Sequence, residues 1–418
     1  MIRPDNSFED KLKSLGLHMG FKNLERKDSP HQRIPIDKVI DGYDEITRFG
    51  NTYLTEKIYP GGYNHGQIPI DINTNIEVIS EWGNLSPATI NMDQIIFMDT
   101  ETSGLARGTG TFAFMIGLGY FQENDFKVVQ LFMKDPSHEM SLLDVFDRIL
   151  DPFQVIVTFN GKSFDIPLLL NRHIINRIPL PFENKDHWDI LQLSRKLWRS
   201  RLPSRRLADL ELSILGLSRG SEEIPGWLVP EIYKEYLNTG DARPLAGVFY
   251  HNAVDILSLA CIFLHSAKLL NNALSDKDIN HLDLISIARL LEDMNRTDDA
   301  IMLYERSIEL ELPPNLHLQT LMRYAQLMKR RGNWVKSIKL WELASGYASA
   351  DPCIEIAKYY EHKNRDYDNA IKWTLLAQKY IEDNPGTVAG VELPIINHRL
   401  ERLEKKLKNP QVNTEKNS

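Results

Sequence analysis

Hydrophobic residues gather in the middle of the chain, where short apolar runs alternate with polar turns. Four of these runs are continuous enough to predict buried strands, namely residues 94–100, 111–121, 126–135 and 155–159. The turn 122–125 is too short to hold a crossover, so the first three strands are expected to form an antiparallel meander. Apolar residues at helical spacing over 140–150 separate the third strand from the fourth. The pattern predicts an α/β fold: a mixed sheet with three antiparallel strands, later parallel additions and flanking helices.

The two ends of the chain follow different patterns. Residues 1–91 combine a short amphipathic segment, a strand–turn–strand pattern and scattered Pro and Gly, so we expect a partly ordered N-terminal extension that packs on the next domain. After residue 279 the strand patterns stop and a helical repeat begins. The small residues that mark its helix pairs are Ala288 and Ala300, Ala325 and Ser337, and Ala357 and Ala370. Successive units lie 37 and 32 residues apart, and 394–407 would cap the stack. We therefore predict a helical repeat domain over 277–408 and a disordered tail over 409–418.

Length and composition narrow the class of protein. At 418 residues the chain is long enough for two or three domains, with 92–272 as the central one. Its two cysteines, Cys261 and Cys353, lie far apart, which argues against disulfides or a zinc site and favours a reducing cytoplasm. The sequence shows neither a signal peptide nor an apolar run of membrane-spanning length, so we expect a soluble cytoplasmic protein with no membrane contact. A net charge of −8 argues against a constitutive nucleic-acid coat.

Acidic residues follow two of the predicted strands. Asp99 and Glu101 are two positions apart on an extended segment, so their carboxylates point to the same side. Two carboxylates so close repel each other unless a proton or a metal ion lies between them. Asp165 comes after the fourth strand and the turn Asn160-Gly161, and ligands of open α/β sheets gather at the carboxyl ends of strands. Taken singly, the Asp-x-Glu pair also fits a solvated strand end, and Asp165 also fits a helix N-cap.

A further acid lies within the apolar helix predicted over 243–264. His251 and Asp255 are four residues apart and share a face, with Asn252 beside them. Tyr250 is five residues before Asp255, about 140° around a regular helix. A lone helical Asp or His is more often a surface or capped residue. In the middle of an apolar helix, however, a buried carboxylate is costly unless it binds a cation or a partner.

Three elements therefore present four carboxylates, those of Asp99, Glu101, Asp165 and Asp255. This is the composition needed to hold two divalent ions about 3.5–4 Å apart, which together clamp a phosphodiester. Hard oxygen ligands select Mg²⁺ or Mn²⁺ over zinc. A neighbouring His or Tyr can accept the proton of the attacking water. The sequence predicts a two-metal site with nucleic acid, DNA or RNA, as its substrate class.

A basic strip offers possible phosphate contacts. The segment 194–206 contains no acid, and its cations are Arg195, Lys196, Arg199, Arg201, Arg205 and Arg206. On an acidic chain such a strip is either a solvated helix face or a phosphate-binding surface. Asn160 and Lys162, beside the second acid motif, are likewise either phosphate contacts or a turn residue and a solvated lysine.

The acid motifs resemble those of a known superfamily. The pieces DTETSGL, NGKSFD and YHNAVDILSL are similar to the three motifs of the DEDD 3′–5′ exonuclease superfamily, which has the ribonuclease H-like fold. Residues 92–268 also resemble the bacterial YprB-type ribonuclease H-like family, through GTGTFAFMIGLGYF and IPGWLVPEIYKEYLNTGDARPL. The resemblance implies a 3′–5′ exonuclease in which the four acids are the metal ligands and Leu105 wedges against the terminal base.

The third motif departs from the usual pattern. The superfamily usually has Tyr four residues before the Asp or His five residues before it, whereas here His251 is at the first position and Tyr250 at the second. The spacing of Asn160 to Asp165 resembles the Tyr-type members, such as the proofreading domains of family B polymerases. We therefore assign the water-activating role to His251, with Tyr250 as the alternative.

The C-terminal region resembles tetratricopeptide repeats, which implies a concave face that docks a protein. A packing module that braces the nuclease is the alternative. For the whole chain we expect a cytoplasmic 3′–5′ exonuclease that acts on single-stranded or frayed ends. The competing hypotheses are a structure-specific endonuclease and a repeat-bearing adaptor that binds nucleic acid without cutting it.

Overall fold

The computed structural model describes residues 33–84, 90–104, 110–220, 223–383 and 393–408. The chain separates into two compact units, Met1–Asn272 (unit 1) and Ala273–Ser418 (unit 2), and each is described by itself.

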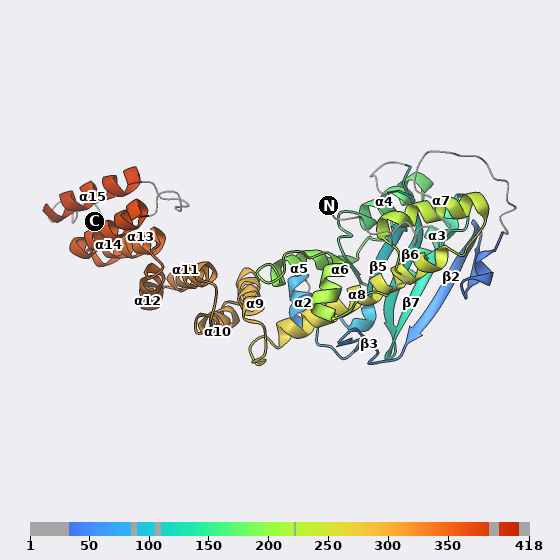
Figure 1. Ribbon diagram of the computed structural model, residues 1–418, viewed down its shortest axis with the longest axis horizontal. Coiled ribbons are helices and arrows are strands. Elements are labelled where there is room, and N and C mark those ends of the chain that lie inside the picture. The colour runs from blue at the N-terminus through green and yellow to red at the C-terminus, as the bar shows by residue number, and fades with distance from the viewer. Residues whose placement is uncertain (1–32, 85–89, 105–109, 221–222, 384–392, 409–418) are drawn as a thin grey trace, which may run out of the picture. The chain divides into compact units, whose positions relative to one another are not determined.

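Unit 1 is built around a mixed sheet, whose described part has seven strands in the order β1-β2-β7-β6-β5-β8-β9 (Figure 1). The strands are β1 Tyr43–Thr47, β2 Gly50–Tyr59, β5 Ile95–Thr102, β6 Ala113–Gln122, β7 Asp125–Phe132, β8 Val155–Thr158 and β9 Asp186–Asp189. Neighbouring strands from β1 to β5 are antiparallel, whereas β8 and β9 join β5 in parallel. The predicted α/β fold with a mixed sheet is confirmed, and the four strands predicted for it correspond to β5, β6, β7 and β8.

Two strands of this sheet come from the N-terminal region. β1 pairs with β2, and β2 pairs with β7 from Tyr53↔Phe132 to Tyr59↔Phe126. β2 places buried Tyr53 and Leu54 against β7, so apolar burial draws this hairpin into the sheet. The sheet therefore extends into residues 43–59, which the sequence pattern had assigned to an extension. A small second hairpin follows, formed by β3 Asn64–His65 and β4 Ile68–Pro69.

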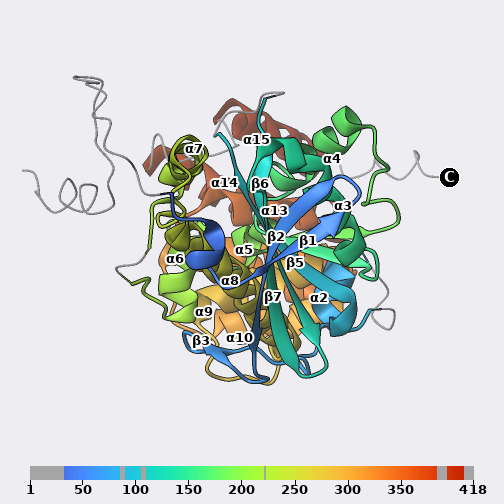
Figure 2. The ribbon, with the colours of Figure 1, turned by 90° about the vertical axis from the view of Figure 1, so that its right-hand side faces the viewer.

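Helices cover both faces of the sheet (Figure 2). They are α2 Glu77–Trp82, α3 Glu139–Leu150, α4 Asp165–Asn176, α5 Ile190–Leu197, α6 Leu207–Leu210, α7 Val229–Thr239 and α8 Leu245–Asn271. Side chains alternate along β5, so Phe97 faces α8, where its ring centroid lies 5.4 Å from that of Phe263. Ile96 points to the other face and joins a hydrophobic cluster with Phe146 of α3 and Leu169 of α4. By length and composition α8 could cross a membrane, but 72% of its most apolar window is buried inside the protein.

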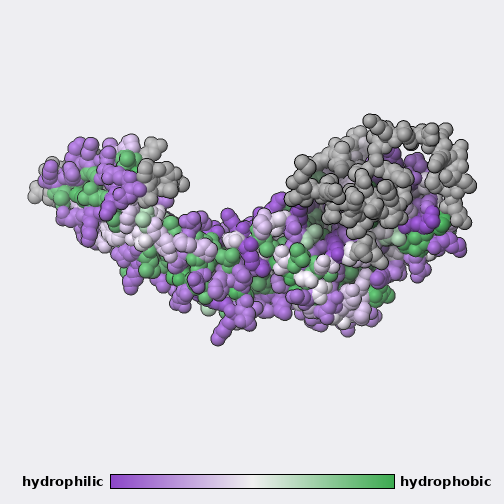
Figure 3. Space-filling view, in the orientation of Figure 1, coloured by the Kyte–Doolittle hydropathy of each residue, from purple (hydrophilic) through white to green (hydrophobic). Residues whose placement is uncertain are grey.

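The described part of unit 2 is helical. Its helices are α9 His281–Asp293, α10 Thr297–Ile308, α11 Pro314–Arg330, α12 Trp334–Ser345, α13 Ala350–Tyr359, α14 Tyr367–Asp383 and α15 Leu393–Lys408. Consecutive helices pack on one another, and the small residues that mark the repeat are all fully buried. Small buried side chains let paired helices approach closely. On the visible surface of this unit, hydrophilic and hydrophobic residues intermix (Figure 3). Membership of the tetratricopeptide family stays a prediction.

Candidate active site

Asp99 and Glu101 lie at the carboxyl end of β5, on the face that α8 covers. β5 and β8 run parallel, from Ile95↔Val155 to Phe97↔Val157, so both strands end at the same edge of the sheet. The register between β5 and β6 shifts at Glu101, as in a β-bulge. Bulges re-aim side chains at the rims of sheets. The two acids therefore reach this edge together, as their spacing predicted.

Asp165 reaches the same edge from α4. It is the first residue of the helix, and Phe164 occupies the N-cap position. Its Oδ1 accepts a hydrogen bond from Oγ1 of Thr100 at 2.5 Å. Because Thr100 lies between Asp99 and Glu101 on β5, this bond holds the third carboxylate beside the first two. The alternative interpretation of Asp165 as a helix cap does not describe its position.

Asn252 connects α8 to the end of β5. Its buried Nδ2 donates to Oδ2 of Asp99 at 3.0 Å, and its Oδ1 accepts from Nε2 of Gln130 at 3.0 Å. Gly117, which pairs with Asp99 on β6, leaves room for this side chain. A Cβ atom on Gly117 would lie 2.2 Å from Oδ1 of Asn252. The missing side chain on β6 thus allows α8 to approach the acids closely.

Asp255 and His251 complete the cluster from α8. Nε2 of His251 lies 3.5 Å from Oδ2 of Asp255 and 4.0 Å from Oε1 of Glu101. One imidazole nitrogen therefore contacts carboxylates from two distant parts of the chain. Nδ1 of the same ring is hydrogen-bonded to Oε1 of Glu223 at 2.7 Å. Tyr250, in contrast, lines a cavity on another side of α8, together with Tyr59 and Tyr63.

Arg219 brings a positive charge into the site. Its guanidinium donates to both oxygens of Glu211, at 2.5 and 2.6 Å, to Oε1 of Glu223 at 2.5 Å, and to Asp255. Glu211 is itself buried, so it orients the guanidinium toward Asp255, the acid on α8. Arg219, Glu211 and Glu223 were missed by the sequence analysis. They lie outside the acid motifs, and no spacing or periodicity marks them.

The carboxylates raise one another's proton affinity. Burial raises the pKa of Asp99, and Asp255, Glu101 and Asp165 raise it further. Burial, followed by Asp255 and Asp165, raises the pKa of Glu101 to about 8, although nearby His251 opposes the shift. Burial also raises the pKa of Asp165 to about 6. Burial is the largest cause of each shift, and for Asp99 and Glu101 repulsion between the carboxylates adds to it. A multivalent cation would relieve that repulsion.

His251 shows the opposite balance. Burial alone would lower its pKa, but the hydrogen bond with Glu223 and the charges of Asp255 and Glu101 raise it to about 9. The surrounding carboxylates therefore stabilise the imidazolium form.

The donor chemistry of the cluster fits a divalent cation. Carboxylate oxygens are the ligands that Mg²⁺ and Mn²⁺ prefer. Among the described residues, no three His, Cys, Asp or Glu side chains are placed as the ligands of a single ion. Three of the acids are instead engaged by protein groups, Asp99 by Asn252, Asp165 by Thr100 and Asp255 by Arg219. The assignment of Asp99, Glu101, Asp165 and Asp255 as ligands of a divalent cation stays a prediction.

Asp189 fixes the loop that leads to Asp165. It is fully buried at the end of β9, where it caps α5 by accepting the backbone N–H of Leu191. Its carboxylate also accepts the N–H of Asn160 at 2.8 Å and that of Lys162 at 3.2 Å. Asn160 has a positive φ of 69°, a conformation that Asn tolerates better than most residues. The backbone of Asn160 thus shapes the loop, and the Lys162 side chain is exposed. A contact of either residue with phosphate stays a prediction.

The middle of the basic strip lies away from Asp255. Trp198, in its middle, stacks on His265 of α8 with ring centroids 6.3 Å apart. His265 follows Asp255 by ten residues on α8, which corresponds to about 15 Å along the helix. The exposed cations of the strip are Arg195, Lys196, Arg199 and Arg206, whereas Arg201 and Arg205 are half-buried. Leu105 lies outside the described residues.

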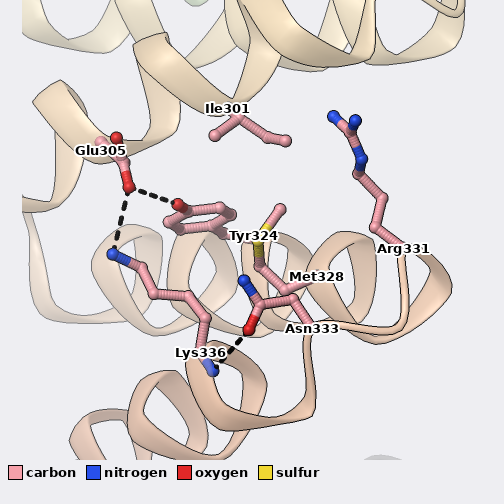
Figure 4. A pocket seen from close by; sticks show the side chains of 7 residues that line it. All are labelled: Ile301, Glu305, Tyr324, Met328, Arg331, Asn333 and Lys336. Atoms are coloured by element: carbon pink, nitrogen blue, oxygen red, sulfur yellow. Dashed lines mark hydrogen bonds and ion pairs between the residues drawn. The ribbon is translucent and has the colours of Figure 1, made fainter.

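Unit 2 holds a pocket of about 370 Å³ between α10, α11 and α12 (Figure 4). Glu305 accepts hydrogen bonds from the Tyr324 hydroxyl at 2.9 Å and from Nζ of Lys336 at 3.1 Å. Arg331 forms an ion pair with Asp298. Asn333 caps α12 by accepting the backbone N–H of Lys336. The polar groups of this pocket are thus engaged with one another or with neighbouring residues.

Comparison with known proteins gives three findings. Residues 96–266 match the model of the RNase_H superfamily, and this segment contains all four acids. Uncharacterized protein YprB of Bacillus subtilis (strain 168) is 29% identical over 430 residues, covering 96% of this chain and 99% of that protein. The family B DNA polymerase of the hyperthermophilic archaeon Pyrobaculum calidifontis is a structural neighbour with 17% identity and a TM-score of 0.33. That match covers 50% of this chain, which spans 28% of the polymerase.

Proposed function

We propose that this chain is a divalent-metal-dependent nuclease that hydrolyses phosphodiester bonds, and specifically a 3′–5′ exonuclease on single-stranded or frayed nucleic acid. The observation that carries the proposal is the meeting of acids from β5, α4 and α8 at one edge of the sheet, where an imidazole lies between Glu101 and Asp255. The RNase_H superfamily match over 96–266 supports it. The 3′–5′ polarity comes from the resemblance of the motifs to DEDD exonucleases.

The four carboxylates would hold the metal ions, Mg²⁺ or Mn²⁺. A bound pair of such ions activates the attacking water and stabilises the leaving oxygen. Cations bound at Asp255 and Glu101 would offset the charges that keep His251 protonated, and its Nε2 could then accept the proton of that water, because Nδ1 is held by Glu223. The imidazolium that results would be stabilised by Glu223, Asp255 and Glu101, the same groups that raise its pKa. Arg219 would keep Asp255 and Glu223 in place around this ring.

Strands labelled at the 3′ end or at the 5′ end, as DNA and as RNA, test the proposal in parallel. An exonuclease of the proposed polarity releases the 3′ label first as a mononucleotide and leaves circular strands intact. Cleavage of circular strands would instead support the structure-specific endonuclease. Binding of the strands without any metal-dependent cleavage would support the adaptor.

For unit 2 we propose that the helices dock a protein partner. The support is the packed series of helices with buried small residues at their contacts. Co-purification from cells with the full chain, compared with a chain ending at residue 272, tests this role. A partner retained equally by both would contradict it.

A further inference from the structure

The cavity that Tyr250 lines in unit 1 has a volume of about 410 Å³ and lies on the flank of α8 away from Asp255. Its wall on α8 is formed by residues at helical spacing, namely Ala246, Phe249, Tyr250, Ala253, Val254 and Leu257. Asp255 is about 140° around the helix from Tyr250, so α8 separates this cavity from the acids. Lys57 and Tyr59 line the cavity from β2, three strands from β5 in the sheet order, or about 14 Å at the usual strand spacing. The cavity therefore lies on the face of α8 away from Asp255, and it shares Arg219 with the candidate active site.

The lining has a chemistry of its own. None of the described residues around it is an Asp or Glu, on a chain whose net charge is −8. Tyr59 and Tyr63 face each other with ring centroids 4.8 Å apart and planes inclined by 57°. Nζ of Lys57 lies 5.1 Å from the centroid of the Tyr59 ring. Lys57 and Tyr63 are exposed, so an aromatic ring and a cation stand at the entrance of the cavity. The rest of the lining combines apolar side chains with four polar ones, those of His65, Gln130, Ser218 and Arg219.

We propose that this cavity binds a nucleotide, with its base against Tyr59 and Tyr63 and its phosphate at Lys57. A volume of this size lies in the range that holds small ligands. Aromatic side chains stack with any base, and a neighbouring lysine supplies the charge that a phosphate needs. The nucleotide would be either a unit of the bound strand or a released mononucleotide. Both of these sources rest on the proposed function, because they require a nuclease substrate or product. The binding chemistry of the cavity itself does not depend on cleavage.

Titration calorimetry of the full chain with adenosine 5′-monophosphate, adenosine and ribose 5-phosphate tests this inference. The Asp99→Asn background removes product binding at the acids. In this variant we expect adenosine 5′-monophosphate to bind in the cavity. Adenosine and ribose 5-phosphate should each bind at least about tenfold more weakly than the nucleotide. Lys57→Ala and Tyr63→Ala should each lower the affinity for the nucleotide by about tenfold. Lys127→Ala, on the adjacent strand but on the opposite face of the sheet, should leave the affinity unchanged.

Absence of nucleotide binding, or affinities in the Lys57 and Tyr63 variants equal to wild type, would overturn the inference. If Tyr63→Ala unfolds early, exposed Lys57 carries the test alone. A single-stranded oligonucleotide separates the two sources. If the Lys57 and Tyr63 variants both bind the oligonucleotide more weakly, the cavity holds a unit of the bound strand. If they bind it as tightly as before, the cavity holds a free mononucleotide. Either result supports the inference. Nucleotide binding without any cleavage by wild type would contradict the proposed function but support nucleotide binding in the cavity. Cleavage without nucleotide binding would support the proposed function and contradict nucleotide binding in the cavity.

Discussion

At the scale of single residues, Asp255 illustrates how much of the site a sequence can reveal. A carboxylate in the middle of an apolar helix needs a partner, and this cost singled it out. The strand-end acids Asp99 and Glu101 followed from the two-residue period of a strand. Arg219 could not be predicted in the same way, because it lies in an irregular segment and its contact with Asp255 joins residues 36 positions apart. Acids with a strict local period are predictable, whereas their counter-charges depend on tertiary folding.

The choice between His251 and Tyr250 can be tested by substitution. His251→Gln should lower the turnover number by about 10²–10⁴-fold, the usual contribution of a general base. Tyr250→Phe should leave it within about twofold, because Tyr250 lines a cavity on another side of α8. Steady-state rates on one labelled strand measure both. A larger loss in Tyr250→Phe than in His251→Gln would reverse the assignment.

At the scale of elements, the site depends on how closely α8 approaches the sheet. The strands β5 to β8 were predictable because their apolar runs are long and bounded by turns. The strand–turn–strand pattern of β1 and β2 was also visible, but their place in this sheet was not, because their partner β7 lies about seventy residues later. The contact of Gly117 with Asn252 is also invisible in the sequence. A glycine in a strand signals a close approach without naming the partner.

Gly117→Ala should push α8 away from β6. The added Cβ meets Asn252, so we expect a loss of about 1–3 kcal/mol in the free energy of unfolding of unit 1. Cleavage should fall as well, because Asn252 no longer holds Asp99. Denaturant unfolding and rate measurements check the two effects. Gly110→Ala is the matched control, because a Cβ there meets no atom within 4 Å. Equal stability of the two variants would show that the packing against α8 is not tight.

At the scale of the whole molecule, each unit is stabilised by its own set of interactions. Unit 1 is built on a sheet core. Unit 2 consists of packed helices with a buried charge among them. Glu361 accepts bonds from Arg399, Arg402 and Lys406, the last at 2.8 Å, and so ties α15 to the preceding helices. The helical periodicity and the final helix could be predicted from the sequence. The charge cluster could not, because Glu361 and its partners lie about forty residues apart.

Glu361→Gln should destabilise unit 2 by about 1–3 kcal/mol at pH 7, because it leaves several cations without their shared carboxylate. Burial alone would raise the pKa of Glu361, but Lys406, Arg402 and Arg399 lower it from 4.5 to about 2. A lowered folded-state pKa contributes stability above pH 4.5, and this contribution is lost as the pH falls toward 2.

Thermal unfolding at pH 7 and pH 3 checks this linkage. The difference between wild type and Glu361→Gln should shrink at pH 3, while exposed Glu404→Gln should match wild type at both. The rate of cleavage at pH 7 should not change, because the four acids lie in unit 1. A difference that grows on acidification would contradict the account.

The most direct test of the central claim is the initial rate of Mn²⁺-dependent mononucleotide release from a 3′-labelled single strand, measured for wild type and for Asp99→Asn side by side. The substitution keeps the size of the side chain and removes one of the four charges. We predict clear release by wild type and a rate at least about 10³-fold lower for a folded Asp99→Asn protein. Equal rates for the two proteins would contradict the assignment of these carboxylates to catalysis.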